Sequence, residues 1–321
     1  MARNGASAII VLPPGAQGRI GDEAHKRWLS RGRISFAEPD SEMLVTVLKL
    51  IGAPVPNGGL AALRYWGQSG ERSTTWMAAA DPVHLETRLH TLRLRSLRPD
   101  EVTEHELQTL FDHLQATVGN DSNFSFVTIG QCGYLRTACP IDTVPVSAQV
   151  LHGLPPDEFV PSGETVAKYH QLLGELQMAL HEHDVNQRRA RSGQPEINSL
   201  WLWGGGIVAE PVAHPLPTLF ANDPLFRGYW NQSFAEVKDW DGDIERVVEK
   251  SDSGFVAVLP EPGPEIAART LTDCLDQLKR LAGRPLVLLF RDGLAVEINR
   301  WDALRPWRSV APILNRSGGN D

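Results

Sequence analysis

The stretch 186–206 contains the residues whose types and spacing best suit a binding site. It ends in the segment Asn198–Trp203, which reads NSLWLW and is followed by Gly204, Gly205 and Gly206. Glycine permits backbone angles and close approaches that a side chain would block. Successive backbone N–H groups in such a segment can hold a small anion. The simpler alternative is a buried core strand that ends in a flexible turn.

Two arginines are candidates to assist the glycine segment. Arg189 lies near the end of the helix expected before it, and Arg227 follows it in the segment Leu225–Gly228. A guanidinium group pairs well with phosphate, so the expected ligand is a small phosphorylated or otherwise anionic molecule. For each arginine alone, a surface position or a helix-capping role is the alternative. The candidate binding residues are Arg189, Asn198, Gly204, Gly205, Gly206 and Arg227.

Other reactive side chains lack the spacing of a metal or redox site. The three cysteines, Cys132, Cys139 and Cys274, are an odd number and include no CxxC pair. They predict reduced thiols in a cytoplasm rather than disulfides or zinc ligands. His181 and His183 are two residues apart and point to different faces of a helix. We therefore expect solvated or capping histidines there, and no metal pair.

The composition bounds the class of protein. The chain has 321 residues, 42% of them hydrophobic, and a formal net charge of −8. These values predict a soluble protein of one large or two ordinary domains. This negative net charge disfavours nucleic-acid binding, which depends on basic patches. No apolar run reaches the roughly 18 residues that cross a bilayer, and the N-terminal run is too short for a signal sequence. We expect a cytoplasmic protein that does not bind membranes.

Strand-like and helix-like patterns alternate along the chain. Continuous apolar runs at 7–12, 254–259 and 286–290 are typical of buried strands, and Asp292-Gly293 predicts a hairpin turn after the last of them. Helical periodicity predicts one long helix over 165–191. This alternation predicts an α/β sheet.

A set of seven residues in and around the glycine stretch points to a family. The set is Asn186, Arg189, Gly193, Asn198, Leu200, Gly204 and Gly206. With it, the chain resembles a proteobacterial group of phosphoglycerate-mutase-like proteins, some of them labelled RpfE-type regulatory proteins. It is more distantly similar to archaeal-type cofactor-independent phosphoglycerate mutases of the alkaline phosphatase superfamily. The resemblance implies an alkaline-phosphatase-like core sheet, at 1–81 and 199–321, with helices on both faces. It also implies a smaller inserted α+β subdomain at 82–198.

The resemblance also implies a metal site, and the sequence departs from it. The mutases of this family use two manganese or zinc ions, held by ligands that follow three strands. At these places the chain has Pro13-Pro14-Gly15, the proline-rich segment Pro260–Pro264, and Asp292-Gly293 in place of an Asp-His pair. Trp203 stands where the family has an arginine before its Gly-x-Gly, which removes a phosphate-pairing group. The sequence therefore predicts a mutase scaffold that has lost its metal chemistry and holds no cofactor.

Three functions follow from these observations. The favoured one is a non-catalytic binding or regulatory protein. The second is an active phosphoglycerate mutase or phosphatase that binds manganese or zinc through substituted ligands. The candidate ligands are Asp22, Glu261, Asp292, His84 and His214.

The third function is a structural interaction protein with tryptophan anchors, for which core positions are the alternative. The tryptophans outside the central stretch include Trp66, Trp76, Trp230, Trp240, Trp301 and Trp307. The sequence names no ligand, protein partner or oligomeric state.

Overall fold

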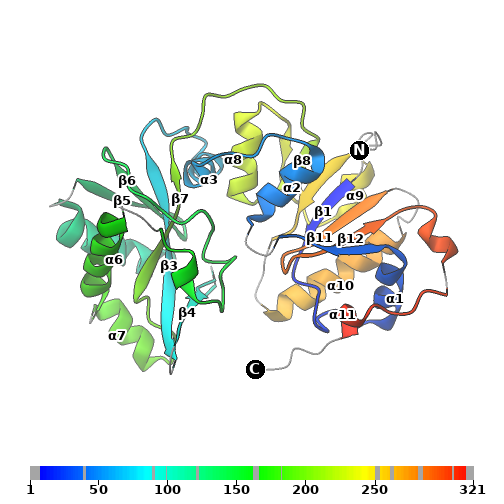
Figure 1. Cartoon of the computed structure of the whole chain (residues 1–321), viewed down its shortest axis with the longest axis horizontal. Helices are drawn as coiled ribbons and strands as arrows, with labels where there is room; N and C mark the ends of the chain where they lie inside the picture. Colours follow the sequence, from blue (N-terminus) through cyan, green and yellow to red (C-terminus); the bar gives the residue numbers. More distant parts are fainter. Residues whose placement is uncertain are drawn as a thin grey trace. The chain divides into compact units, whose positions relative to one another are not determined.

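The chain folds into two compact units. The computed structural model describes residues 8–38, 41–88, 91–98, 100–120, 123–161, 166–181, 183–249, 254–260, 264–280, 285–305 and 307–315. Unit 1 comprises residues 1–54 and 211–321, and unit 2 comprises residues 55–210. Figure 1 shows the elements of each unit. Glu261 lies outside the described residues.

Unit 1 is built on a seven-stranded mixed sheet in the order β2-β12-β11-β1-β10-β8-β9. Its strands are β1 (Ala8–Leu12), β2 (Arg33–Phe36), β8 (Thr218–Ala221), β9 (Val237–Lys238), β10 (Phe255–Val258), β11 (Leu286–Phe290) and β12 (Leu294–Ile298). The central strand β1 pairs in parallel with β10 and β11. Strands β12 and β2 complete one side as antiparallel strands. The α/β class and the hairpin at Asp292-Gly293 are therefore confirmed.

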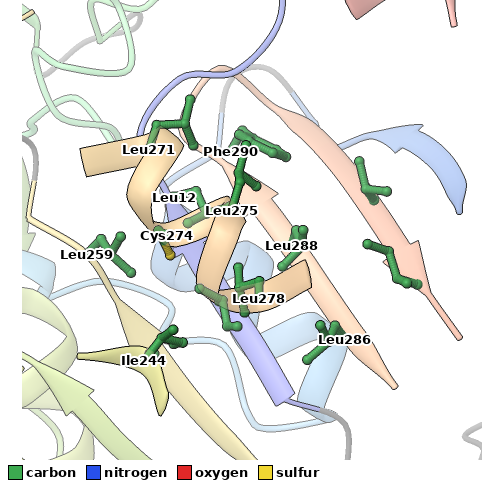
Figure 2. Close-up of a cluster of buried hydrophobic side chains, with 14 of the residues drawn as sticks. Leu12, Ile244, Leu259, Leu271, Cys274, Leu275, Leu278, Leu286, Leu288 and Phe290 are labelled. Atoms are coloured by element: carbon green, nitrogen blue, oxygen red, sulfur yellow. The ribbon is translucent and has the colours of Figure 1, made fainter. Parts of the chain in front are cut away.

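Helices cover both faces of this sheet. They are α1 (Glu23–Arg31), α2 (Met43–Ile51), α8 (Pro224–Gln232), α9 (Ile244–Glu249), α10 (Pro264–Arg280) and α11 (Pro312–Asn315), with a 3₁₀ turn η3 (Asp302–Leu304). Leu275 of α10 joins Leu12 and Leu288 in one buried cluster (Figure 2). Ile9 and Val11 point to the opposite face, because side chains alternate along a strand. They are also buried, and Figure 1 shows α2 and α8 on that side.

Unit 2 is inserted between the two segments of unit 1 and has an α+β organisation. Its elements are α3 (Leu60–Ser69), β3 (Met77–Arg88), β4 (Thr91–Ser96), α4 (Glu104–Leu114), the π-helical turn η1 (Gln115–Gly119), β5 (Phe124–Ile129), β6 (Cys132–Thr137), the 3₁₀ turn η2 (Pro156–Glu158), α6 (Val166–Leu180), α7 (Asp184–Arg191) and β7 (Ser199–Gly206). The strands form one antiparallel sheet in the order β4-β3-β6-β5, and β7 pairs with β3.

The structure moves both predicted domain boundaries. The sequence places them at 81/82 and 198/199, whereas the units divide at 54/55 and 210/211. The reason is the pairing of β3 with β7, which runs from Met77 opposite Gly206 to Val83 opposite Ser199. Residues 55–81 and 199–210 therefore belong to the inserted unit rather than to the core.

The single helix predicted over 165–191 is wrong. The structure has α6 and α7 instead, and residue 165 lies outside the described residues. His183 separates the two helices with extended backbone angles, φ −63° and ψ 141°. Its Nδ1 atom accepts a hydrogen bond from the N–H of Val185, so this histidine caps α7. The expectation of capping histidines is confirmed at this residue.

Membrane-spanning elements are absent from the described helices. None of them is long and apolar enough to cross a bilayer.

Candidate functional site

The glycine segment packs backbone to backbone against the start of α3. Gly204 has φ +63° and Gly206 has φ +150°, which side chains rarely adopt. A Cβ atom on Gly206 would lie 2.5 Å from the backbone nitrogen of Gly59. The N–H of Gly59 donates to the carbonyl oxygen of Gly205 at 3.1 Å. Glycine is needed here because two backbones approach more closely than a side chain allows.

Two N–H groups of this segment already have acceptors within the protein. The N–H of Gly204 donates to the carbonyl oxygen of Val144 at 2.8 Å. That of Gly205 donates to the Oγ1 atom of Thr143 at 2.9 Å. An anion would have to displace both acceptors to bind these groups. The core strand of the simpler alternative is present, but the glycines belong to that strand and pack against α3 instead of forming a flexible turn.

A buried ion pair lies beside the end of β7. The Nη1 atom of Arg64 lies 2.8 and 2.9 Å from the two carboxylate oxygens of Asp81. The indole N–H of Trp203 donates to the same carboxylate at 2.6 Å. The guanidinium of Arg64 also lies over the rings of Tyr134 and Trp203. Burial opposes the charge of Arg64, but the Asp81 carboxylate outweighs it and raises the pKa of Arg64 well above its usual value.

Arg189 is a buried bridge between α7 and the start of α4. It is only 1% exposed. Its Nε atom donates to the carbonyl oxygen of Pro195 at 2.8 Å. Its Nη1 atom donates to the carbonyl oxygen of Glu101 at 2.9 Å and to the Oε1 atom of Glu106 at 3.1 Å. Arg189 therefore occupies neither the surface nor a helix cap, and its guanidinium is shielded from solvent.

The remaining candidates, Asn198 and Arg227, form hydrogen bonds with different parts of the chain. Asn198 bonds both backbone groups of Leu85 on β3, with Oδ1 accepting at 2.8 Å and Nδ2 donating at 3.0 Å. Arg227 belongs to unit 1, whereas the other five candidates belong to unit 2. It donates to the carbonyl oxygen of Ala221 and to the carboxylate of Asp239. Of the six candidates, the three glycines are the ones that lie next to each other, at the end of β7.

The carboxyl ends of the parallel strands in unit 1 carry arginine–aspartate pairs. Asp292 follows β11, and its Oδ2 atom accepts from the N–H of Ala16 at 2.7 Å and lies 3.8 Å from Nη1 of Arg19. Arg291 donates to the carbonyl oxygen of Leu259 at 3.1 Å. Its Nη2 atom also lies 3.9 Å from the carboxylate of Asp223. The charges at this edge are thus largely compensated within the protein.

The donors that the structure describes at this edge do not fit a pair of manganese or zinc ions. Such ions need several carboxylate or imidazole ligands that converge on one point. Within the described ranges, no group of three or more His, Cys, Asp or Glu side chains is placed to hold a metal. Asp223 faces Arg291 and also caps α8, where its Oδ1 accepts from Leu225 at 2.9 Å. The carboxylates at this edge serve arginines and backbone N–H groups instead.

In the part of the chain that the structure describes, three of the substituted ligands considered for an active enzyme bond to other groups of the protein. Asp22 caps α1 by accepting from the backbone of Ala24 and His25. His84 lies on β3 of unit 2, where its Nδ1 atom bonds the carbonyl oxygen of Glu196 at 2.9 Å. His214 lies in unit 1, in the segment between β7 and β8, and its backbone N–H donates to Ser233.

Sequence reasoning missed the pairs Arg64–Asp81, Arg19–Asp292 and Arg291–Asp223. The available signal was the position of Arg291 and Asp292 directly after a buried strand, where a parallel sheet presents side chains to a ligand.

Comparison with known proteins gives a distant relationship. No protein-family model matches the chain. The 2,3-bisphosphoglycerate-independent phosphoglycerate mutase of Methanosarcina barkeri is 24% identical over 196 residues, which are 56% of this chain and 49% of that protein. A probable mutase of the same kind from Geobacter sulfurreducens is 25% identical over 130 residues, 39% of this chain and 31% of its own length. The chain is distantly similar to these phosphoglycerate mutases.

Two solved structures align with most of the chain at low sequence identity. A cofactor-independent phosphoglycerate mutase from Thermoplasma acidophilum aligns at a TM-score of 0.39 and 18% identity, covering 91% of this chain and 90% of that one. The PH0037 protein of Pyrococcus horikoshii aligns at 0.47 and 12% identity, covering 91% and 87%. The chain spans half or less of the length of the two curated mutases, so their activity does not transfer with the similarity.

The packing of the glycine segment predicts that Gly206→Ala destabilises unit 2. A Cβ atom there would meet the backbone of Gly59, at a positive φ angle as well. We expect a loss of about 2 kcal/mol or more in the free energy of unfolding, measured by urea denaturation. Gly174→Ala is the matched control, because nothing lies within 4 Å of its Cβ position in α6. It should stabilise by up to about 1 kcal/mol. Equal effects of the two substitutions would contradict the packing.

Glu106 predicts a pH dependence of stability. Burial is the largest influence and raises its pKa, but hydrogen bonds from Thr103 and Arg189 outweigh burial and hold the pKa below the ordinary 4.5. A lowered folded-state pKa stabilises above 4.5, and that contribution is lost as the pH falls through the folded-state value. Glu106→Gln should therefore reduce the loss of stability below pH 4.5. Thermal unfolding measured across this pH range tests the expectation. Glu104→Gln removes a carboxylate from the same helix and is the control, and an equal change in both variants would contradict the role of Glu106.

Proposed function

We propose that the chain is a non-catalytic binding or regulatory protein on a phosphoglycerate-mutase-like scaffold. The observation that supports this proposal is the use of Asp292, whose Oδ2 atom accepts the N–H of Ala16 and faces Arg19. A carboxylate that ligates a catalytic metal would have to give up these partners. Kinship with RpfE-type regulatory proteins and a cytoplasmic location are parts of the same proposal.

The charges at the carboxyl edge argue in the same direction. Two divalent ions bring four positive charges, which a site of anionic ligands must offset. Here Asp292 and Asp223 each lie within 4 Å of an arginine. A cation bound by either carboxylate would lie close to the guanidinium of Arg19 or of Arg291. The electrostatics therefore favour an anion over a metal at this edge.

The ligand in this proposal is a small phosphorylated anion. Of the six residues that the sequence singles out, Arg227 is the one that presents a partly exposed guanidinium at the carboxyl edge of a parallel sheet. Its side chain is 31% exposed and pairs with Asp239, an exposed carboxylate that an anion could displace. Arg19, which is 53% exposed, offers a second guanidinium at the same edge.

One observation favours the second candidate, an active mutase or phosphatase with substituted ligands. The Oδ1 atom of Asp292 is buried and has no hydrogen-bond partner among the described residues. A buried carboxylate oxygen without a partner is costly, and a bound cation would relieve that cost. Asp292 is the only member of the candidate ligand set with such an atom among those described.

Metal analysis separates the two candidates. The protein purified from manganese- and zinc-supplemented medium should contain less than about one equivalent of either metal, since the two-ion mechanism needs a pair. It should also fail to interconvert 3-phosphoglycerate and 2-phosphoglycerate, while the Methanosarcina barkeri mutase assayed alongside does so. Two equivalents of metal that disappear in Asp292→Asn, together with turnover, would establish the enzyme instead.

A thermal-shift titration tests the anion. We expect 3-phosphoglycerate to raise the melting temperature of the intact chain, because a ligand that binds only the folded state stabilises it. Arg227→Ala should remove most of the shift. Arg246→Ala is the matched control, since Arg246 is an exposed arginine of the same unit on α9. A shift that is the same in both variants would assign the anion elsewhere, and no shift with any phosphate ester would leave regulation through protein contacts.

A further inference from the structure

A segment of unit 1 exposes three large apolar side chains at regular spacing. This segment, the tryptophan strap, comprises residues 299–305 and 307–310 between β12 and α11 and is drawn in orange-red in Figure 1. Trp301 is 60% exposed, Leu304 63% and Trp307 78%. The backbone makes i to i+3 hydrogen bonds from Leu304 to Trp301 and from Arg308 to Arg305. Trp301 directly precedes the 3₁₀ turn η3, which ends at Leu304, and Trp307 follows three residues later, so the three exposed apolar side chains lie within a segment of seven residues.

The strap is held in place by specific contacts. Asp302 is almost fully buried, and its Oδ2 atom accepts from the N–H of Asn299 at 2.8 Å. Its Oδ1 atom pairs with Arg305 at 3.0 Å. Arg308 donates to the carbonyl oxygens of Arg31 and Gly32. Because a fixed strap exposes these side chains, their exposure is a feature of the folded unit. Large exposed apolar groups of this kind mark interaction sites.

Positive charge surrounds the exposed tryptophans. Arg300, whose guanidinium lies 4.7 Å from the ring centre of Trp301, is exposed, as are Arg305 and Arg308. Arg33 at the start of β2 is exposed as well. The described acid of the strap, Asp302, is buried and already paired with Arg305. This local surplus of arginine stands in a chain whose net charge is −8. Charge complementarity therefore selects an acidic partner.

An unpaired strand edge lies beside the strap. Strand β2 ends the seven-stranded sheet and pairs with β12, so its outer edge has no strand partner among the described strands. The bonds from Arg308 to residues 31 and 32 place the strap at the beginning of β2. Phe36 at the other end of β2 is 59% exposed. An open edge can accept an extended peptide as an added strand. A polypeptide can use this edge, whereas a lipid surface cannot.

We propose that the tryptophan strap and the outer edge of β2 form a docking surface for an acidic, extended segment of a partner protein. The added strand pairs with the backbone of β2, its apolar side chains cover Trp301 and Trp307, and its carboxylates meet Arg33 and Arg300. Tryptophan and arginine are the residues that most often dominate the energy of protein interfaces. This inference goes beyond the proposed anion site, because no residue of the docking surface takes part in that site.

Fluorescence anisotropy on the intact chain tests the docking surface. The probe is a fluorescein-labelled peptide of about ten alternating glutamate and valine residues, which suits an added strand whose side chains alternate. We expect saturable binding that falls about tenfold or more in Trp301→Ala/Trp307→Ala, the size of effect seen for interface anchors. Phe234→Ala removes a residue of unit 1 that is 71% exposed but lies outside the strap, and it should bind as the parent does.

Further probes fix the mode of binding. The same peptide with proline in place of every valine should not bind, because proline cannot donate a hydrogen bond to β2. A lysine–valine peptide should also fail, and Arg33→Glu/Arg300→Glu should weaken the glutamate peptide. The thermal unfolding of each variant shows whether it is folded. Peptide binding is measured independently of phosphate binding. A negative result for the docking surface is therefore distinguishable from a negative result for the proposed anion site.

Several outcomes would overturn the docking surface. Absence of peptide binding, or equal binding by the folded double tryptophan variant, would do so. Tryptophan-dependent binding to phosphatidylglycerol vesicles without peptide binding would assign the strap to a lipid surface. A concentration-dependent dimer that Trp307→Ala dissociates, again without peptide binding, would assign it to a second copy of the chain.

Discussion

The buried ion pair between Arg64 and Asp81 is the interaction on which unit 2 depends. Asp81 lies on β3 and Arg64 on α3, and Trp203 of β7 donates its indole N–H to the same carboxylate. The Asp81 side chain is 20% exposed, and a largely buried carboxylate is costly unless its lone pairs are filled, so these contacts favour keeping the three elements together. That requirement draws α3 onto the sheet where β7 ends, and only glycine leaves room for the approach of the two backbones. The glycine segment is thus explained by packing before any ligand is invoked.

Local patterns predicted much of the fold, and non-local pairing accounts for the rest. The β11–β12 hairpin follows from two apolar runs and an Asp-Gly turn, all within thirteen residues. The domain boundaries depend on β3 pairing with β7, whose residues are far apart in the sequence and carry no local signal of each other. The break between α6 and α7 was hidden for another reason. The segment 181–191 is polar and contains no glycine or proline to mark a break, and the cap made by His183 is visible only in the structure.

At the candidate site as well, the sequence identified the residue types but not where the fold places them. Arg189 and Asn198 were singled out because they match a mutase pattern, and the structure gives each a bridging role between backbone segments. Asn186 behaves likewise, bonding both backbone groups of Ile197 and the carbonyl oxygen of Leu180. A pattern of this kind can persist because it holds a fold together, whatever becomes of the chemistry. Residue types alone could not separate a buried bridge from a phosphate ligand, since both use a guanidinium in the same way.

Both proposed binding surfaces of unit 1 depend on the way its described charges are paired. In an open α/β sheet the carboxyl edge is the usual place for a ligand. At that edge Asp292 and Asp223 each face an arginine, so little net field remains to hold a metal ion. The tryptophan strap is the opposite case, because exposed arginines flank apolar side chains that the unit leaves uncovered. The proposed binding role thus rests on two described features of unit 1, the arginine-paired acids of the sheet edge and the fixed strap with its exposed arginines and tryptophans.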